Sequence, residues 1–312
     1  MTGDWRPGAD REAIEARARL LRRIRAFFDA RGMLEVDTPL LCRYGASEPH
    51  IEGMACGERQ LQTSPEYAMK RLLAAGIGDC YQICHAFRAG EVGAMHNPEF
   101  SLLEWYRVGF DHHRLMDEVE TLLSELLTER LRAPAERITY AEAFERHLGL
   151  DPFAADQSAL EAAAGPLLPE ADLDRDALLE LLMALRIQPR LPDDRLSFIH
   201  DWPLSQGALA RALPGEPPRA ARFEVYLGAV ELGNGYWELT DDDEQARRFD
   251  EDNRRRRAAG LAPVLPDARL LAALRAGLPD CAGVAIGLDR VLMLRLGRAT
   301  LDEVLSFSWE RC

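Results

Sequence analysis

The chain has a single lysine, Lys70, among 312 residues, and almost all of its basic character comes from arginine. We interpret this scarcity as a compositional bias. Positive charge is also scarce overall, because 38 lysines and arginines face 52 aspartates and glutamates, for a formal net charge of −14. A protein that grips a nucleic-acid backbone needs a basic surface, because phosphate neutralisation dominates that affinity. The charge therefore argues against broad nucleic-acid binding.

Long apolar runs are missing as well, so no membrane span is expected. The first ten residues are polar and lack the apolar core of a secretory signal peptide. The six cysteines follow no paired spacing: Cys42, Cys56, Cys80, Cys84, Cys281 and Cys312. Without a second ligand pair at zinc spacing, we expect Cys80 and Cys84 to be core residues. These features predict a cytoplasmic protein with free thiols.

The hydrophobic pattern predicts an α+β fold, with one antiparallel sheet flanked by helices in a single domain of residues 1–312. Residues 10–31 read as an amphipathic helix, with its apolar face at Ile14, Ala18, Leu21, Ile24 and Phe28. Further helices are expected over residues 114–132 and 241–259, and strands over residues 33–38, 81–88, 97–108 and 221–239. Residues 133–218 are proline-spotted and predict a helical insertion.

The run FEVYLGAVE at residues 223–231 predicts a hairpin turned at Gly228 and Ala229. Alternation along each strand then places Glu224, Tyr226 and Glu231 on one face. Two carboxylates on one face repel unless a positive group lies between them, and Mg²⁺ accepts such oxygen ligands. A solvated outer face is the alternative interpretation.

The run GNG at residues 233–235 predicts either a bulge or a close approach of the backbone to a ligand. A one-residue bulge would return Glu238 to the face of Glu231. A buried carboxylate at that position suits an ammonium group. The alternative is an exposed glutamate at the end of a strand.

Two short runs far apart in the chain each carry one arginine among glycines and apolar residues. They are FRAGEVGAMHNPEF at residues 87–100, which continues into LLEWY at residues 102–106, and GVAIGLDR at residues 283–290. A guanidinium plane both binds phosphate and stacks on rings, so lysine would not replace it. Either arginine alone is more often part of a surface ion pair, but together they predict a nucleotide site.

These runs resemble motifs 2 and 3 of the class II aminoacyl-tRNA synthetases, and in detail those of the lysine-specific enzymes. The resemblance covers residues 12–309 and implies ATP as co-substrate and Mg²⁺ as cofactor, with Arg88 and Arg290 as catalytic residues. It also implies an ATP site made of Arg88, Ala89, Gly90, Glu91, His96, Asn97, Phe100, Glu231, Leu232, Gly287 and Arg290. Glu224 and Glu231 would hold magnesium. The amino-acid site would comprise Ser64, Pro65, Glu66, Glu104, Tyr106, Glu238 and Ala285.

The chain departs from the lysyl-tRNA synthetases at three places. Gly90 stands where they carry a glutamate, and Glu91 is the candidate replacement. Ala285 stands where a glycine is common, and its methyl group would crowd an α-amino group and suit a substrate whose amino group lies one carbon further along. About 30 residues precede the motif-1-like strand, which leaves no room for an anticodon-reading barrel.

The chain therefore looks most like the short lysyl-tRNA synthetase paralogues that modify elongation factor P. That resemblance implies activation of (R)-β-lysine as an adenylate and its transfer to a lysine of elongation factor P, with tRNA binding unlikely. The helix and strand at residues 10–38 resemble motif 1, which implies a homodimer. Three alternatives stay open: a related enzyme with another acceptor, a truncated synthetase that charges tRNA, and a non-catalytic regulatory paralogue.

Overall fold

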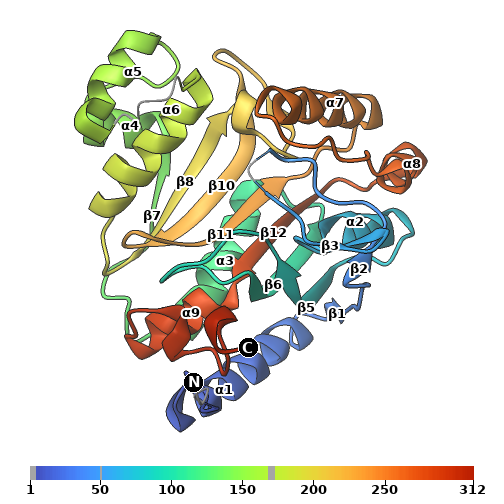
Figure 1. Ribbon diagram of the computed structural model, residues 1–312, viewed down its shortest axis with the longest axis vertical. Helices are drawn as coiled ribbons and strands as arrows, with labels where there is room; N and C mark the ends of the chain where they lie inside the picture. The colour runs from blue at the N-terminus through green and yellow to red at the C-terminus, as the bar shows by residue number, and fades with distance from the viewer. Residues whose placement is uncertain (1–4, 50, 168–172) are drawn as a thin grey trace.

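The computed structural model describes residues 5–49, 51–167 and 173–312 and has the predicted α+β architecture (Figure 1). Its strands are β1 (Leu34–Glu35), β2 (Leu41–Cys42), β3 (Ala55–Cys56), β4 (Arg59–Leu61), β5 (Cys80–Phe87), β6 (Glu99–Val108), β7 (Glu136–Thr139), β8 (Leu196–Pro203), β9 (Ala212–Leu213), β10 (Arg219–Leu227), β11 (Val230–Trp237) and β12 (Cys281–Gly287). Its α-helices are α1 (Arg11–Asp29), α2 (Glu66–Ala74), α3 (His112–Leu126), α4 (Tyr140–Leu148), α5 (Gln157–Ala164), α6 (Arg175–Leu182), α7 (Asp242–Ala258), α8 (Ala268–Gly277) and α9 (Leu288–Leu296).

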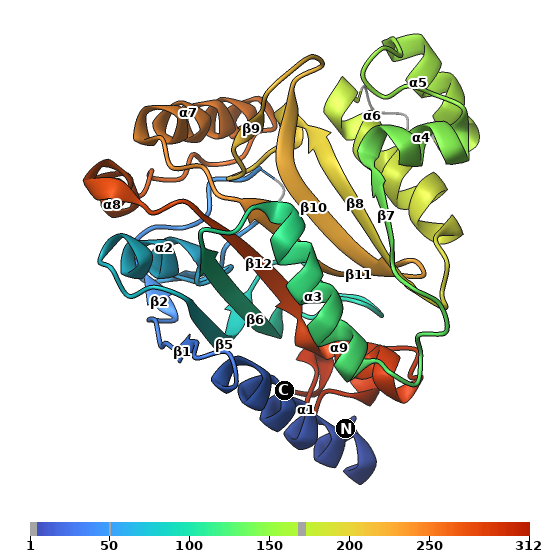
Figure 2. The same ribbon diagram turned by 180° about the vertical axis from the view of Figure 1, so that it is seen from behind.

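One large sheet organises the chain, in the order β1-β5-β6-β12-β11-β10-β8-β7, with β9 paired to β10. The inner pairs from β5 to β8 are antiparallel, whereas β1 and β7 pair in parallel at the two edges. Helix α3 crosses the back of the sheet (Figure 2) and packs with α1 and α9 on the largest apolar core. The opposite face of the central strands is thereby left for a site.

Helix α1 is where it was predicted, and its buried face matches the prediction at Ile24 and Phe28 but not at Ile14 and Ala18. Asp10 caps it by accepting a hydrogen bond from the Ala13 backbone N–H at 2.8 Å. The buried residues are Ala13, Ala16, Leu20, Ile24, Phe27 and Phe28, and Ile14 is 44% exposed. In the N-terminal half of α1 the buried residues are the alanines Ala13 and Ala16, whereas the larger Ile14 points away from the core.

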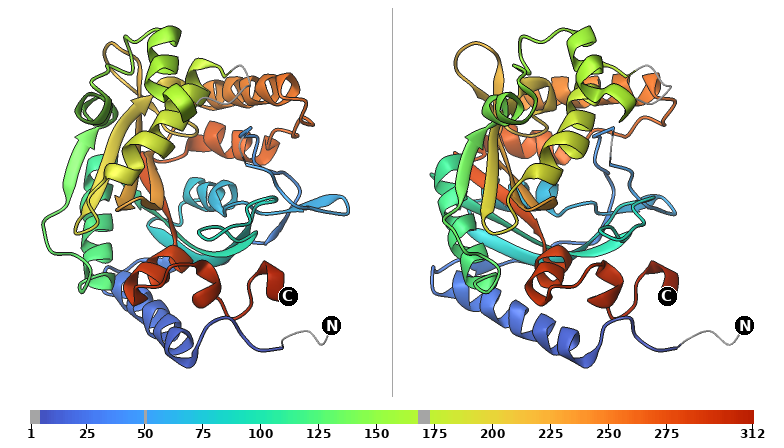
Figure 3. Two further views of the ribbon diagram at one scale, coloured as in Figure 1. Left: turned by 60° about the vertical axis from the view of Figure 1, so that its left-hand side comes forward. Right: turned by 90° about the vertical axis from the view of Figure 1, so that its left-hand side faces the viewer.

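The segment of residues 133–218, predicted to be helical, has helices in its middle and strands at its ends. Helices α4, α5 and α6 pack into a separate apolar cluster, and they stand together far from α1 in both views of Figure 3. Strands β7 and β8 complete the edge of the main sheet. Nearly every residue of β8 is buried, so it lacks the polar and apolar alternation of a half-exposed strand.

The β10–β11 hairpin has the predicted register. Leu227 pairs with Val230 and Tyr226 with Glu231, and Gly228 has φ +58° in the turn. The bulge lies at Leu232, one position before the glycine run, because the next pair joins Val225 to Gly233. It returns Glu238 to the face of Glu231, as the sequence predicted.

Gly233 and Gly235 of the hairpin lie in close contact with the neighbouring strands of the sheet. A Cβ on Gly233 would lie 2.3 Å from Ile286 Cδ1, and one on Gly235 would lie 2.4 Å from Phe223 Cζ. The close approach is therefore to neighbouring side chains of the sheet. Strand β11 is continuous through Trp237.

The strand expected over residues 33–38 shrinks to the two residues of β1. Within the described ranges, no helix is both long and apolar enough to cross a bilayer. All six cysteines are free, as predicted.

Candidate active site

A cavity of about 1070 Å³ opens on the face of the sheet opposite α3 and α1. The central strands β6, β10, β11 and β12 form its floor, and the start of α2 and the loop after β5 close its sides. Most residues singled out from the sequence line it: Ser64, Pro65, Glu66, Arg88, Glu91, His96, Asn97, Phe100, Glu104, Tyr106, Glu224, Glu231, Leu232, Glu238, Ala285, Gly287 and Arg290. Ala89 and Gly90 do not line it. The fold thus gathers residues that are up to 226 positions apart in sequence, from Ser64 to Arg290.

Glu66, Glu104 and Glu238 line one end of the cavity, and the buried Lys70, which is not itself a lining residue, pairs with two of them. Its ammonium nitrogen lies 2.6 Å from Glu66 Oε1 and 2.6 Å from Glu238 Oε2. Lys70 and Glu238 are each 1% exposed. A buried charge is costly unless it is paired, so this lysine belongs to the site. Compositional bias stays our interpretation of why lysine is scarce, but the sequence analysis did not single out Lys70 as a residue of the site.

A signal for Lys70 was present in the sequence. Ser64 Oγ accepts a hydrogen bond from the Glu66 backbone N–H at 3.0 Å and so starts α2, with Pro65 at the N-cap position. Residues four apart on a helix are neighbours, so Glu66 at the start of α2 brings Lys70 onto the same face. The partner Glu238 directly follows the end of β11 and could not be inferred locally.

Glu104 is the third carboxylate at this end and is held from two sides. Ser64 Oγ donates to its Oε2 at 2.6 Å, and the Tyr106 hydroxyl donates to its Oε1 at 2.7 Å. Glu104 and Tyr106 are two apart on β6 and share a face, as predicted. Their positions leave Glu104 buried but hydrogen-bonded.

These carboxylates share an excess of negative charge. Burial and, to a smaller extent, the neighbouring Glu66 raise the pKa of Glu104 to about 7. Burial also raises the pKa of Glu238 to about 8, although Lys70 opposes the shift. Burial lowers the pKa of Lys70, but Glu238 and Glu66 outweigh that effect and leave it above its ordinary value. The site therefore favours additional positive groups.

Strand β12 sets the depth of the acidic end. A Cβ on Gly283 would lie 2.3 Å from Tyr106 Cε1 and 2.7 Å from Glu238 Oε1, so only glycine leaves these side chains in place. Ala285, two residues on, pairs with Glu104 of β6 and lines the cavity. Its methyl group narrows the floor on the same face.

The other end of the cavity presents arginines. Arg290, at the start of α9, donates from Nε to the Met95 carbonyl at 3.1 Å and from Nη1 to the Glu231 carbonyl at 2.9 Å. Its Nη2 lies 2.7 Å from His96 Nε2. Burial lowers the pKa of His96, and the Arg290 charge lowers it further. A neutral imidazole can accept this hydrogen bond, so His96 helps to hold the guanidinium.

Arg88 lies beside an aromatic ring, as expected for a ring-binding site. Its guanidinium carbon is 5.1 Å from the centroid of Phe100, and Glu91 Oε1 is 3.7 Å from its Nη1. Gly90 has φ +77°, a backbone conformation that an ordinary glutamate there would adopt only with strain. Gly90 therefore turns the chain, and Glu91, the next residue, lines the cavity.

Asn97 is committed to the fold. Its Nδ2 donates to the Glu99 carbonyl at 2.6 Å, and its Oδ1 accepts from the Trp309 backbone N–H at 2.9 Å. Both ends of the amide are therefore used within the protein. Asn97 ties the loop before β6 to the C-terminal segment.

Glu224 and Glu231 face the same part of the cavity. Arg222, which the sequence analysis did not single out, contacts Glu224 there. Arg222 Nη2 and the Tyr226 hydroxyl both donate to the Glu224 carboxylate. Burial and the charge of nearby Glu231 together raise the pKa of Glu224 to about 7. Arg222 is two residues from Glu224 on β10, and this spacing was the available signal. Glu231 is less buried and supplies the open oxygen ligands that fit magnesium.

Comparison with known proteins agrees with this geometry. The family model described as tRNA synthetases class II (D, K and N) matches residues 3–311. The chain belongs to this family. It is also similar to proteins named elongation factor P--(R)-beta-lysine ligase. The relative from Klebsiella pneumoniae subsp. pneumoniae is 44% identical over 99% of both chains, and that from Vibrio vulnificus is 45% identical over 98% of both.

A third relative with the same name, from Erwinia tasmaniensis, is 44% identical over 100% of this chain and 99% of its own. The match therefore runs nearly end to end and includes the insertion helices. The shared architecture accounts for the position of the cavity, because the four central antiparallel strands carry nearly all of its floor.

Proposed function

We propose that this chain is an ATP-dependent ligase that activates a lysine-like amino acid, with (R)-β-lysine preferred, and transfers it to a lysine of elongation factor P. The observation that carries the proposal is the charge distribution within one cavity. Glu66, Glu104 and Glu238 surround the single ammonium of Lys70, so this end of the cavity reaches an excess of two negative charges when all three carboxyls are ionised. A lysine-like amino acid has two ammonium groups. The names of the relatives supply the acceptor.

The first step would be in-line attack by a carboxylate oxygen of the amino acid on the ATP α-phosphorus. The bond to the bridging oxygen breaks, and pyrophosphate leaves. Arg88 and Arg290 are the cations of the cavity suited to the phosphate charge, and Phe100 offers a ring face to adenine. Such chemistry rests on positioning and electrostatics, and it needs no side-chain nucleophile.

Magnesium would be held by Glu231 together with Glu224, and it would supply charge neutralisation at the leaving phosphates. Arg222 keeps Glu224 in place through its ion pair. The protein therefore orients one carboxylate and leaves the other accessible.

In the second step the ε-amine of an elongation factor P lysine would attack the acyl carbon, and AMP would leave as the amide forms. The nitrogen loses one proton in this step, and that proton passes to water. Glu66 and Glu238, which hold the substrate's ammonium groups, keep those amines protonated and unreactive. The acceptor amine is then the only neutral nucleophile at the acyl carbon.

ATP–pyrophosphate exchange tests the activation step, with (R)-β-lysine and α-lysine compared side by side without an acceptor. We expect exchange with both and a higher kcat/KM for (R)-β-lysine. Preference for α-lysine would overturn the substrate assignment and leave the activation chemistry standing. Absence of exchange with either would overturn the proposed enzyme and favour a non-catalytic paralogue.

The acceptor is tested separately with labelled amino acid, using purified elongation factor P and unfractionated tRNA. We expect label on the protein at a lysine, stable to mild alkali as an amide. Alkali-labile label on tRNA would favour a truncated synthetase. The net charge of −14 supports the protein acceptor, because tRNA binding depends on a basic surface.

The proposed assembly is a homodimer in the cytoplasm. Leu34, Leu40 and Leu41, in and next to β1 and β2, are between 41% and 52% exposed, and motif 1 forms the dimer interface in this family. The six free thiols are consistent with a reducing compartment.

A further inference from the structure

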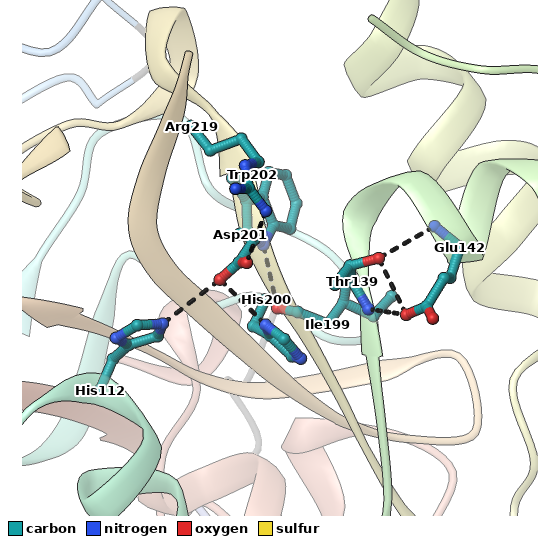
Figure 4. A network of polar contacts seen from close by, with 8 residues as sticks. All are labelled: His112, Thr139, Glu142, Ile199, His200, Asp201, Trp202 and Arg219. Carbon is teal, nitrogen blue, oxygen red and sulfur yellow. Dashed lines mark hydrogen bonds and ion pairs between the residues drawn. The ribbon is translucent and has the colours of Figure 1, made fainter. Parts of the chain in front are cut away.

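Three histidines and one aspartate meet on the molecule away from the cavity. His112 and His113 begin α3, and His200 and Asp201 lie near the end of β8. One potential ligand atom from each of the four lies within 4.8 Å of the others. His112 and Asp201 are buried, whereas His113 is exposed. Figure 4 shows His112 and His200 reaching Asp201 from different elements.

Asp201 takes up an unusual backbone conformation to face these histidines. Neighbouring side chains of a regular strand point to opposite faces. Asp201 has φ +59°, at the place where the β8–β10 register shifts, and its carboxylate lies on the side of His200. A positive φ costs free energy in a residue other than glycine. The strand thus accepts local strain at the residue that joins the cluster.

The distances fit a small transition-metal ion. His112 Nε2 lies 3.3 Å and His200 Nδ1 lies 3.0 Å from the same oxygen, Asp201 Oδ1. Bonds of about 2.0–2.1 Å to a tetrahedral Zn²⁺ place neighbouring ligand atoms roughly 3.3 Å apart. His113 adds a third imidazole next to His112, with ring centroids 4.1 Å apart. Imidazole and carboxylate are ligands that zinc accepts.

The surroundings orient the aspartate and leave one buried nitrogen unsatisfied. Arg219 Nη1 lies 3.2 Å from Asp201 Oδ2, which leaves Oδ1 for the histidines. Hydrogen bonds of this kind hold the ligating carboxylate in many metal sites. His112 Nδ1 is buried and has no hydrogen-bond partner among the described residues. Such a group is tolerated where the side chain has a further role.

We propose that His112, His113, His200 and Asp201 form a structural site for a divalent transition-metal ion of the zinc type. The ion would join the start of α3 to β8. Trp202, the next residue of β8, lines the substrate cavity, so the ion would fix that strand beside it. The site is separate from the magnesium ligands, which lie within the cavity.

Metal titration of the full-length protein tests this proposal. The protein is stripped with a chelator, and Zn²⁺ is titrated by calorimetry with Mg²⁺ in excess to occupy the carboxylates of the cavity. We expect one ion per chain and a rise in Tm on binding. His113→Asn and His200→Asn should each lower the affinity about tenfold or more. His113 is exposed, so its replacement leaves the core intact.

The matched control is His85→Asn, an exposed histidine that pairs with Glu99 and should bind zinc as the wild type does. Co²⁺ provides a second measurement, because the six free thiols are competing ligands. Intense visible bands without a thiolate-to-cobalt charge-transfer band are expected. A thiolate band, unchanged affinity in the His113→Asn/His200→Asn double variant, or no ion bound by the wild type would overturn the proposal.

Discussion

Lys70 is the residue whose importance the sequence conceals most. Its ammonium separates Glu66 and Glu238, so the two carboxylates tolerate burial side by side. Removing one partner of a buried ion pair leaves the others uncompensated. Lys70 therefore holds Glu66 and Glu238 in place at the acidic end, and its buried ion pairs also stabilise the fold.

Lys70→Met should destabilise the protein by about 3–5 kcal/mol, because Glu66 and Glu238 lose their shared cation. It should also change the KM for the amino acid more than the KM for ATP, since the charge change is confined to the acidic end. Urea unfolding and pyrophosphate exchange measure the two effects. Arg247→Met removes an exposed ion pair with Glu244 and is the control, with little change expected. Equal stability of both variants would contradict this assignment.

The raised pKa values of Glu104 and Glu238, about 7 and 8, predict how substrate affinity depends on pH. Ammonium groups bind the ionised carboxylates. At pH 6 both groups hold protons in the free enzyme, and binding must displace them. As pH rises through 7 and 8 the carboxylates ionise, so the Kd of the amino acid should fall by up to about tenfold per unit.

Calorimetry between pH 6 and pH 8.5, in buffers of different ionisation enthalpy, measures both the Kd and the protons released. Glu104→Gln removes one titrating group and should flatten the lower part of the profile. A Kd independent of pH in the wild type would show that the carboxylates are already ionised in the free enzyme.

At the scale of an element, β12 controls the shape of the acidic end through two small residues on one face. Gly283 leaves room for Tyr106 and Glu238, and Ala285 narrows the floor. The central strands flank it on both sides, with β6 and β11 hydrogen-bonded along most of its length. A change of one methyl group cannot be absorbed by moving the strand.

Two single-methyl variants of β12 should therefore act in opposite ways. Gly283→Ala drives a Cβ against Tyr106 and should lower kcat/KM on the order of a hundredfold. Ala285→Gly removes a methyl group and should improve α-lysine relative to (R)-β-lysine by about tenfold or more. Pyrophosphate exchange measures both, and thermal unfolding verifies that each variant is folded. Unchanged selectivity in Ala285→Gly would remove Ala285 from the specificity argument.

At the scale of the whole molecule, the two faces of the sheet differ: one is buried in the core and the other is open to the cavity. Helices α1, α3 and α9 bury one face, and the other face carries the cavity. Apolar side chains remain exposed around β1 and β2, at the edge of this arrangement. We expect these exposed apolar side chains to form part of the proposed dimer interface.

Leu34→Asp should convert the proposed homodimer into a monomer, because it places a charge on that surface. Light scattering coupled to size exclusion measures the mass. The control Leu185→Asp changes a leucine that is also exposed, at 47%, but lies in the insertion, and it should remain dimeric. A wild type of monomeric mass, or a Leu34→Asp variant that stays dimeric, would refute the interface.

The sequence by itself determined the features that depend on short spacing. Alternation along two strands and a glycine turn predicted the β10–β11 register, and the two arginine-bearing runs predicted residues that line one cavity. The bulge that returns Glu238 to the Glu231 face also followed from local pattern, although its position shifted by one residue. These features could be predicted because each depends on the preferences of a few consecutive residues.

Only the tertiary structure decided which distant groups meet. Lys70 of α2 pairs with Glu238, which follows β11, and Asn97 accepts a hydrogen bond from the C-terminal segment. His112 of α3 contacts Asp201 of β8. Strand β8 was missed because burial on both of its faces removes the alternation of polar and apolar residues. Burial and the pairing of charges depend on the whole packed chain, since a charged group finds its partner wherever the fold brings one within reach.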